Sequence, residues 1–340
     1  MLLNLVIVAL TAWVLDPDAL ADTIAAPASR AGWTVRPFAP ARGISSTEFA
    51  QRFLGARWSD GAHTAGDHLR QNGTVKISRQ ANDPPSDFDW RSSYASFSTC
   101  VGPVVNQSPD DANGTEQKCG SCWAVSAVET FSDRRCIWLR RSTNSTDAPR
   151  IELSALDLIA CDRECEHFHE DCNQGCLGGF PELAWEWFES NGVRSAECMP
   201  YNLSKQLLCP LVPCEPPISD QPYFTKKHYQ PFGTSHIRSE LVNGGPVQST
   251  FTVYEDFMNY AGGIYKHISG KKLGLHAVKV IGYGVGPDGE EFWTAMNSWG
   301  PDFGINGTFM IAVGECNFES AVLAGDPCLP DDPYPCHNVP

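Results

Sequence analysis

The chain has 340 residues, 14 cysteines and a formal net charge of −15 at pH 7. This length allows one large domain or two halves around a cleft. The acidic balance, without any basic block, is not typical of nucleic-acid-binding proteins, so no nucleic-acid partner is expected.

The first 21 residues are predicted to be a secretory signal peptide. Residues 2–15 are mostly apolar, and Ala19-Leu20-Ala21 fits a small-residue cleavage site. A buried first strand is the alternative. No later apolar run is long enough to span a bilayer, so no membrane contact is expected after signal removal.

The cysteine content predicts a disulfide framework formed in an oxidising compartment. Such a compartment disfavours zinc binding by these cysteines, and neither a metal site nor a cofactor is expected. The acidic composition is compatible with a lysosome-like compartment or with secretion. Six Asn-x-Ser/Thr sequons fit the same route and predict a glycoprotein: Asn72, Asn106, Asn113, Asn144, Asn202 and Asn306.

Residues 22–85 form a polar stretch in which one short helix is predicted near residues 46–54. Ser46 or Thr47 could cap this helix, with Phe49 and Phe53 on one face. A Pro-Pro pair at 84–85 then breaks the chain. The stretch is either an ordinary N-terminal subdomain or a removable propeptide, with a mature domain over 86–340.

Residues 86–215 carry helical signals and most of the cysteines. The run Cys119-Gly120-Ser121-Cys122-Trp123 precedes apolar residues at helical spacing, which are Ala124, Ala127, Val128 and Phe131. A cysteine in the first turn of a helix meets aligned backbone dipoles that favour the thiolate. A second helix is predicted to open at Pro181 and to end before Gly192.

From about residue 245 the pattern changes to strands. They are predicted over 276–284, 292–299 and 308–313, with a turn at 287–289 and an irregular tail at 325–340. Helices followed by strands predict an α+β fold with two subdomains and a cleft between them.

Two residues of the strand half could complete a thiol nucleophile. His276 begins one predicted strand and Asn297 ends the next, so a turn between them can bring both side chains together. The Asn oxygen would then accept from one ring nitrogen and fix the tautomer. A histidine paired with Cys122 can lower the thiol pKa to about 3–4. A single histidine beside a strand is usually structural, but the three residues in this order indicate a cysteine nucleophile.

The order of these residues and their flanks resembles the papain family of cysteine proteases, and within it the cathepsin B group. The resemblance covers residues 86–325, and residues 22–83 resemble a short propeptide. It implies a papain-like α+β fold with a helical left half and a β-barrel-like right half around an active-site cleft. It rests on the Cys119–Trp123 run and on Gly175-Cys176-Leu177-Gly178-Gly179, Gly245-Pro246-Val247, Val253-Tyr254-Glu255-Asp256-Phe257 and Asn297-Ser298-Trp299.

By this resemblance Cys122 is the nucleophile, His276 the acid and base, and Asn297 the residue that orients the ring. Glu319 matches the acidic residue of the family's S2 pocket, where a carboxylate would allow Arg to bind; the alternative is a solvated surface glutamate. The resemblance also implies substrate contacts from Gly178, Gly179, Ala277 and Trp299, the last of which would shield the His–Asn contact.

The resemblance further implies a set of disulfides. If Cys328 and Cys336 also pair locally, Cys316 remains a free thiol. The implied pairs are Cys100–Cys136, Cys119–Cys176, Cys161–Cys209, Cys165–Cys172 and Cys198–Cys214.

The sequence departs from the family at the oxyanion hole. Glu116 stands where the family has Gln, and an ionised Glu cannot donate a hydrogen bond. Gln117 is one residue out of place, whereas Gln107 has the right upstream flank and is followed by about nine extra residues. Gln107 is favoured, and losing such a donor costs roughly 10²–10³ in rate.

Two further departures concern the cleft. No His-His pair lies between Tyr201 and Cys209, which predicts an open primed side and endopeptidase action instead of dipeptide removal from C-termini. Leu275 replaces a small residue before the catalytic His and is expected to narrow the cleft.

The sequence therefore predicts a lysosomal or secreted cysteine endopeptidase, made as a zymogen. It is expected to be a monomer that is inhibited by its own propeptide and acts on proteins and peptides. Glu116, the insertion and Leu275 instead favour a silent homologue that binds peptides or partners. A thiol–disulfide oxidoreductase would need Cys119 free, and Cys176 is its expected partner.

Overall fold

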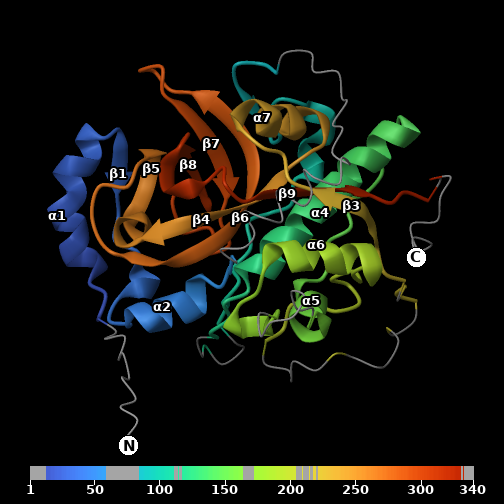
Figure 1. Cartoon of the computed structure of the whole chain (residues 1–340), viewed down its shortest axis with the longest axis horizontal. Coiled ribbons are helices and arrows are strands. Elements are labelled where there is room, and N and C mark those ends of the chain that lie inside the picture. The colour runs from blue at the N-terminus through green and yellow to red at the C-terminus, as the bar shows by residue number, and fades with distance from the viewer. Residues whose placement is uncertain are drawn as a thin grey trace, which may run out of the picture.

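The computed structural model describes residues 13–58, 84–110, 114, 117–163, 172–203, 209, 214, 217–219, 221–330 and 332. Most of the sheet lies in one half of the molecule, flanked by the N-terminal helices, and a second half is built around three other helices (Figure 1). No helix within these ranges is long and apolar enough to cross a bilayer.

The N-terminal segment packs on the sheet half. It contains α1 (Pro17–Arg30), β1 (Trp33–Val35), a 3₁₀ turn (Ala39–Ala41) and α2 (Ser46–Phe53). The α1 helix was not predicted, and a signal cleavage after Ala21 would fall inside it.

The short helix α2 follows the prediction, with Phe49 and Phe53 both buried. Its cap differs from the prediction, because the Ser45 hydroxyl accepts from the Glu48 backbone N–H at 3.0 Å. Ser46 is already the first helical residue, so its side chain is not in the capping position.

The helical half contains α4 (Cys122–Thr143), α5 (Ala155–Cys161) and α6 (Pro181–Ser190). Both predicted helices begin where expected, at Cys122 and at Pro181. Phe131 of α4 packs on Phe188 of α6 with ring centroids 5.1 Å apart. This apolar contact fixes α6 against the helix that begins at Cys122 (Figure 1).

The rest of the chain supplies most of the sheet. Its elements are β2 (Phe88–Asp89), β3 (Thr225–Tyr229), α7 (Thr234–Asn243), β4 (Val247–Tyr254), β5 (Tyr260–Tyr265), β6 (Lys272–Val285), β7 (Glu291–Met296), β8 (Thr308–Ala312) and β9 (Val322–Pro327), with 3₁₀ turns at Ala95–Cys100, Gly175–Leu177, Glu255–Asn259 and Glu315–Asn317.

Within the described ranges, nine strands form one open sheet in the order β1-β5-β8-β7-β6-β4-β9-β3, with β2 paired to β6. The predicted β-barrel-like right half is therefore corrected, since the sheet does not close. Its edge strands lie far apart because β1 belongs to the N-terminal segment and β3 packs beside α6 (Figure 1).

Strand β6 runs through the centre of this sheet and starts four residues before His276. It pairs with β7, which ends at Met296, and so places Asn297 just beyond the sheet.

Candidate active site

Cys122 is the first residue of α4 and is completely buried. Its Sγ accepts from the Ala277 backbone N–H at 3.5 Å, which joins the start of α4 to β6. Burial raises the pKa of the Cys122 thiol to about 12, although nearby backbone N–H groups oppose that shift. In this covered state the thiol is neutral.

His276 and Asn297 lie together as predicted. His276 Nε2 is 2.7 Å from Asn297 Oδ1, and the Trp299 ring packs against the imidazole at a tilt, with ring centroids 5.0 Å apart. The other ring nitrogen, Nδ1, is buried without a hydrogen-bond partner among the described residues. Burial lowers the pKa of His276 to about 4, and the contact with Asn297 only partly offsets this. Nδ1 is the nitrogen that remains for a reacting partner.

Residues 54–57 cross the cleft between its two walls. The Gly179 N–H donates to the Gly55 carbonyl at 2.9 Å, and the Arg57 N–H donates to the Gly179 carbonyl at 2.8 Å. Ala56 bridges Gly179 on one side and Leu275 on the other, and it packs with Cys122 in one apolar cluster. Leu275 therefore contacts this segment, and its expected narrowing of the cleft stays a prediction.

Gly55 has to be a glycine in this position. Its φ is +133°, and a Cβ there would lie 2.0 Å from the carbonyl oxygen of Gly120. Only a residue without a side chain can pass this close to the Cys119–Cys122 turn. Gly178 is equally restricted, since its φ is +110° and a Cβ would meet the Gly55 carbonyl at 2.7 Å.

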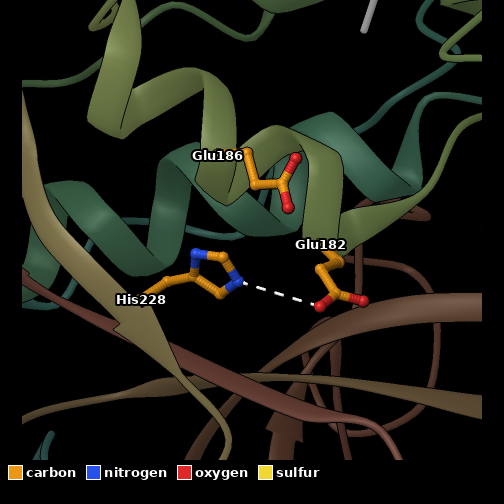
Figure 2. A group of neighbouring side chains, drawn as sticks. All are labelled: Glu182, Glu186 and His228. Atoms are coloured by element: carbon orange, nitrogen blue, oxygen red, sulfur yellow. Dashed lines mark ion pairs between the residues drawn. The ribbon is translucent and has the colours of Figure 1, made fainter. Parts of the chain in front are cut away.

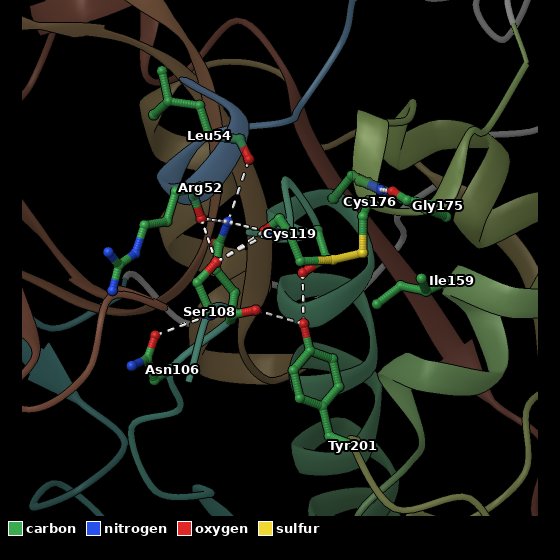
Figure 3. Close-up of a disulfide and its surroundings, with 12 residues drawn as sticks. Arg52, Leu54, Asn106, Ser108, Cys119, Ile159, Gly175, Cys176 and Tyr201 are labelled. Atoms are coloured by element: carbon green, nitrogen blue, oxygen red, sulfur yellow. Dashed lines mark hydrogen bonds between the residues drawn. A yellow bond between two sulfur atoms is a disulfide. The ribbon is translucent and has the colours of Figure 1, made fainter. Parts of the chain in front are cut away.

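Gln107 is fully buried beside the cleft. Its Nε2 donates to the carbonyls of Arg52, Leu54 and Cys119 at 3.1, 3.3 and 3.0 Å, and its Oε1 accepts from the Ser298 hydroxyl at 2.6 Å. These carbonyls gather next to the Cys119 disulfide (Figure 3). The side-chain amide of Gln107 is thus a donor held against the Cys119 carbonyl, three residues before Cys122 in the chain, whereas Glu116 lies outside the described residues.

Tyr201 joins this site and was not singled out from the sequence. Its hydroxyl donates to the Gln107 carbonyl at 2.7 Å and lies 2.8 Å from the Ser121 hydroxyl (Figure 3). Because the Tyr201 hydroxyl has one proton, Ser121 is the donor of the second bond. The sequence carried little indication of this contact, because Tyr201 lies 80 residues from Ser121 along the chain.

Glu319 is half-buried. Its Oε1 accepts from the Trp293 indole N–H at 2.6 Å and from the Gly314 backbone N–H at 2.9 Å. Its S2 role remains a prediction.

The disulfides agree with the implied pairs wherever both halves are described. Cys172 and Cys328 are also disulfide-bonded, while their expected partners Cys165 and Cys336 lie outside the described residues. Among the described cysteines, Cys122 and Cys316 are free. The observed pairs are Cys100–Cys136, Cys119–Cys176, Cys161–Cys209 and Cys198–Cys214.

The bonded Cys119 also excludes a redox pair with Cys122. The segment that would carry an occluding loop, 202–214, is described only in part, so the open primed side remains a prediction.

Comparison with known proteins finds the papain family cysteine protease model matching residues 84–325. A cathepsin B-like protease 1 of Arabidopsis thaliana is 40% identical over 62% of this chain, and the match spans 56% of that protein's length. A cathepsin B-like cysteine proteinase of Schistosoma japonicum is 35% identical over 71% of this chain and 72% of its own length. The solved procathepsin B S9 of Trypanosoma congolense superposes with a TM-score of 0.72 at 26% identity, covering 93% of this chain and all of that one.

Proposed function

Because the chain belongs to the papain family of cysteine proteases, we propose that it is the zymogen of a cathepsin B-like endopeptidase whose residues 22–85 form an inhibitory propeptide. One observation carries this proposal. Residues 54–57 lie across the cleft on Cys122 and pair with Gly179, while the His276–Asn297 contact beside them is already formed. The similarity to a procathepsin B structure supports the same interpretation.

Removing the propeptide changes the charge state of the catalytic pair. Water then reaches Cys122 and His276, which relieves the desolvation that keeps both neutral. The first helical turn of α4 favours the thiolate, and the hydrogen bond from Nε2 to Asn297 leaves Nδ1 to hold the proton. The result is a thiolate–imidazolium pair.

Peptide hydrolysis then follows in two steps. The Cys122 sulfur bonds to the substrate carbonyl carbon, and the C–N bond breaks as His276 gives its proton to the leaving amine. His276 next takes a proton from water, and the hydroxide releases the acyl group from Cys122. Gln107 Nε2 stabilises the oxyanion in both steps. In the zymogen this donor is satisfied by the propeptide carbonyls of Arg52 and Leu54.

The proposed specificity is that of an endopeptidase. No His-His pair lies between Tyr201 and Cys209 to block the primed side. The purified enzyme should cut internal bonds faster than it removes dipeptides from free C-termini, and the reverse order of rates would contradict this. Glu319 is proposed to admit Arg into S2 if its carboxylate turns from Trp293 toward the cleft.

We place the protein in the secretory route, with a lysosomal or secreted destination. The apolar start of the chain, the four observed disulfides and the sequons support this placement. Protein and peptide substrates and a monomeric state complete the proposal.

A thiol-directed epoxide tests the activity. We expect stoichiometric labelling of Cys122 in the acid-activated protein, located by mass spectrometry, and loss of labelling in His276→Ala. If the folded, processed protein is not labelled, the chain is instead a silent homologue.

A glycine pair tests the blocking role of residues 54–57. Gly55→Ala should displace this segment, so the unprocessed zymogen should be labelled at Cys122 at least about tenfold faster at pH 7. Gly43→Ala is the matched control, because Gly43 also has a positive φ, but a Cβ there would meet no other atom within 4 Å. Equal labelling rates in the two variants would contradict a blocking role.

A further inference from the structure

A second polar cluster lies on the helical half, away from Cys122. Glu182 and Glu186 are one turn apart on α6, and His228 faces them from β3 (Figure 2). One ligand atom from each residue lies within 4.8 Å of the others. Sequence spacing alone did not indicate this cluster, because β3 is far from α6 along the chain.

Among the described residues, one ring nitrogen of His228 has a hydrogen-bond partner and the other has none. The side chain is 6% exposed, and Nδ1 lies 2.5 Å from Glu189 Oε1. Nε2 is buried with no hydrogen-bond partner in the part of the chain that the structure describes. It lies 3.9 Å from Glu182 Oε1, which is too long for a hydrogen bond. A buried ring nitrogen without a hydrogen bond is under-satisfied, and the carboxylates of the cluster are the polar groups that face this one (Figure 2).

We propose that Glu182, Glu186 and His228 form a binding site for a divalent cation, with Zn²⁺ as the best-matched ion. One imidazole nitrogen and two carboxylate oxygens are ligands that Zn²⁺ accepts, and water would fill the fourth position. Two carboxylates balance its charge, and His228 would bind it after giving up the proton on Nε2. Exposed Glu186 gives the ion a path from solvent.

The surroundings fit a metal ligand. Glu189 holds Nδ1 and so directs Nε2 toward the ion, as outer carboxylates do for zinc-bound histidines. The ligand atoms need to approach to about 3.3 Å of one another around a tetrahedral zinc. Rotation of the two glutamate side chains can supply this movement, since neither is fully buried.

A bound cation would join α6 to β3. The helix begins two residues after Gly179, so the cation would also hold the chain that forms one wall of the cleft. Binding to the folded state alone stabilises that state, so the melting temperature should rise with zinc concentration. Without a cation, His228 makes ion pairs with Glu182 and Glu189.

The test uses the full-length Cys122→Ser zymogen, stripped with a chelator, so that the catalytic thiol cannot bind the metal. Zinc chloride is titrated by calorimetry, and bound metal is counted after dialysis. We expect one Zn²⁺ per chain and a rise of several degrees in melting temperature. Absence of bound zinc would overturn the proposal and leave only the ion pairs.

Matched variants locate the site. Glu186→Gln is isosteric and exposed, and it should weaken zinc binding at least about tenfold, while Glu189→Gln should weaken it about 10–100-fold through the orientation of His228. Glu197→Gln, an exposed glutamate outside the cluster, should bind like the parent. Equal affinity in Glu186→Gln and Glu197→Gln would overturn the proposal even if zinc binds elsewhere, for example at Cys316.

Discussion

The same two elements, α4 and β6, carry two buried polar clusters that differ in how completely their polar groups are paired. Cys122 begins α4 and His276 lies in β6, and together they form the candidate active site. Further along the same elements, Glu129 and Asp133 of α4 meet Lys279 of β6. The two clusters share a scaffold, so their different behaviour depends on how fully each polar group is paired.

The second cluster is fully paired. Lys279 Nζ lies 2.6 Å from Asp133 and 3.2 Å from Glu129, and Arg150 contacts both carboxylates at 2.7 and 2.9 Å. Burial would raise the pKa of Glu129, but the charges of Lys279 and Arg150 lower it overall. Two cations and two anions balance, and the network joins α4 to the sheet.

The candidate active site is incompletely paired. His276 has one partner, Asn297, and its Nδ1 has none among the described residues. Complete pairing of the Glu129–Asp133–Lys279 cluster stabilises the fold. The unpaired Nδ1 of His276, held on a rigid strand, is instead available for chemistry.

The largest expected effect is on Cys122 and His276, the proposed nucleophile and its proposed base. Cys122→Ser and His276→Ala, freed of the propeptide by an added protease, should each lose about 10⁴-fold or more in kcat/KM on a fluorogenic peptide. The thermal melt of Cys122→Ser should change little, because serine keeps the size of the side chain, and this variant separates loss of activity from loss of folding. Activity within tenfold of the parent would contradict the assigned roles.

Substitution in the paired network around Lys279 should lower the stability of the fold. Lys279→Met leaves two buried carboxylates facing Arg150 alone and should cost about 3–5 kcal/mol in the free energy of unfolding. Urea unfolding with intact disulfides measures this loss. Lys226→Met, which removes an exposed pair with Asp332, is the control and should cost less than about 1 kcal/mol. Similar losses of unfolding free energy in both variants would show that the buried network stabilises the fold no more than an exposed ion pair does.

The next largest effect is expected at Gln107, the proposed oxyanion donor. Gln107→Ala should lower kcat by roughly 10²–10³ with KM little changed, because the lost bond forms mainly in the transition state. Gln117→Ala should keep normal kinetics. If Gln117→Ala instead carries the loss, the donor assignment is wrong.

The smallest expected effect is a pH dependence in how firmly residues 54–57 cover Cys122. Below pH 6.5 an exposed imidazole binds a proton that the covered His276, with a pKa of about 4, does not. The state in which residues 54–57 cover Cys122 therefore loses stability as pH falls from 6.5 toward 4. The fraction of molecules in which this segment has lifted should increase by up to roughly 10² between pH 6.5 and 4.5.

Hydrogen exchange of residues 50–58 in the Cys122→Ser zymogen, corrected for intrinsic rates, measures this opening. A Cys122→Ser/His276→Gln variant should lose the acid-induced part. An unchanged pH dependence in that variant would assign the effect to other groups.

Several features could be predicted because they depend on local sequence. Helical spacing after Cys122, the Pro181 start and the Phe49–Phe53 face are short-range patterns, and each corresponds to an observed helix. The His276–Asn297 contact was also accessible, because one turn joins two neighbouring strands. The cap at Ser45 shows the limit of such reasoning, since helix ends shift by one residue without changing the pattern.

By itself, the sequence indicated the family, and the resemblance implied the candidate reacting residues and the four disulfides that the structure confirms. Only the tertiary structure decided that the sheet stays open, that Ala56 lies on Cys122, and that Tyr201 supports Gln107. It also brought His228 to the carboxylates of α6. These contacts join residues far apart in the chain, so they depend on which surfaces pack together, and no local spacing records that.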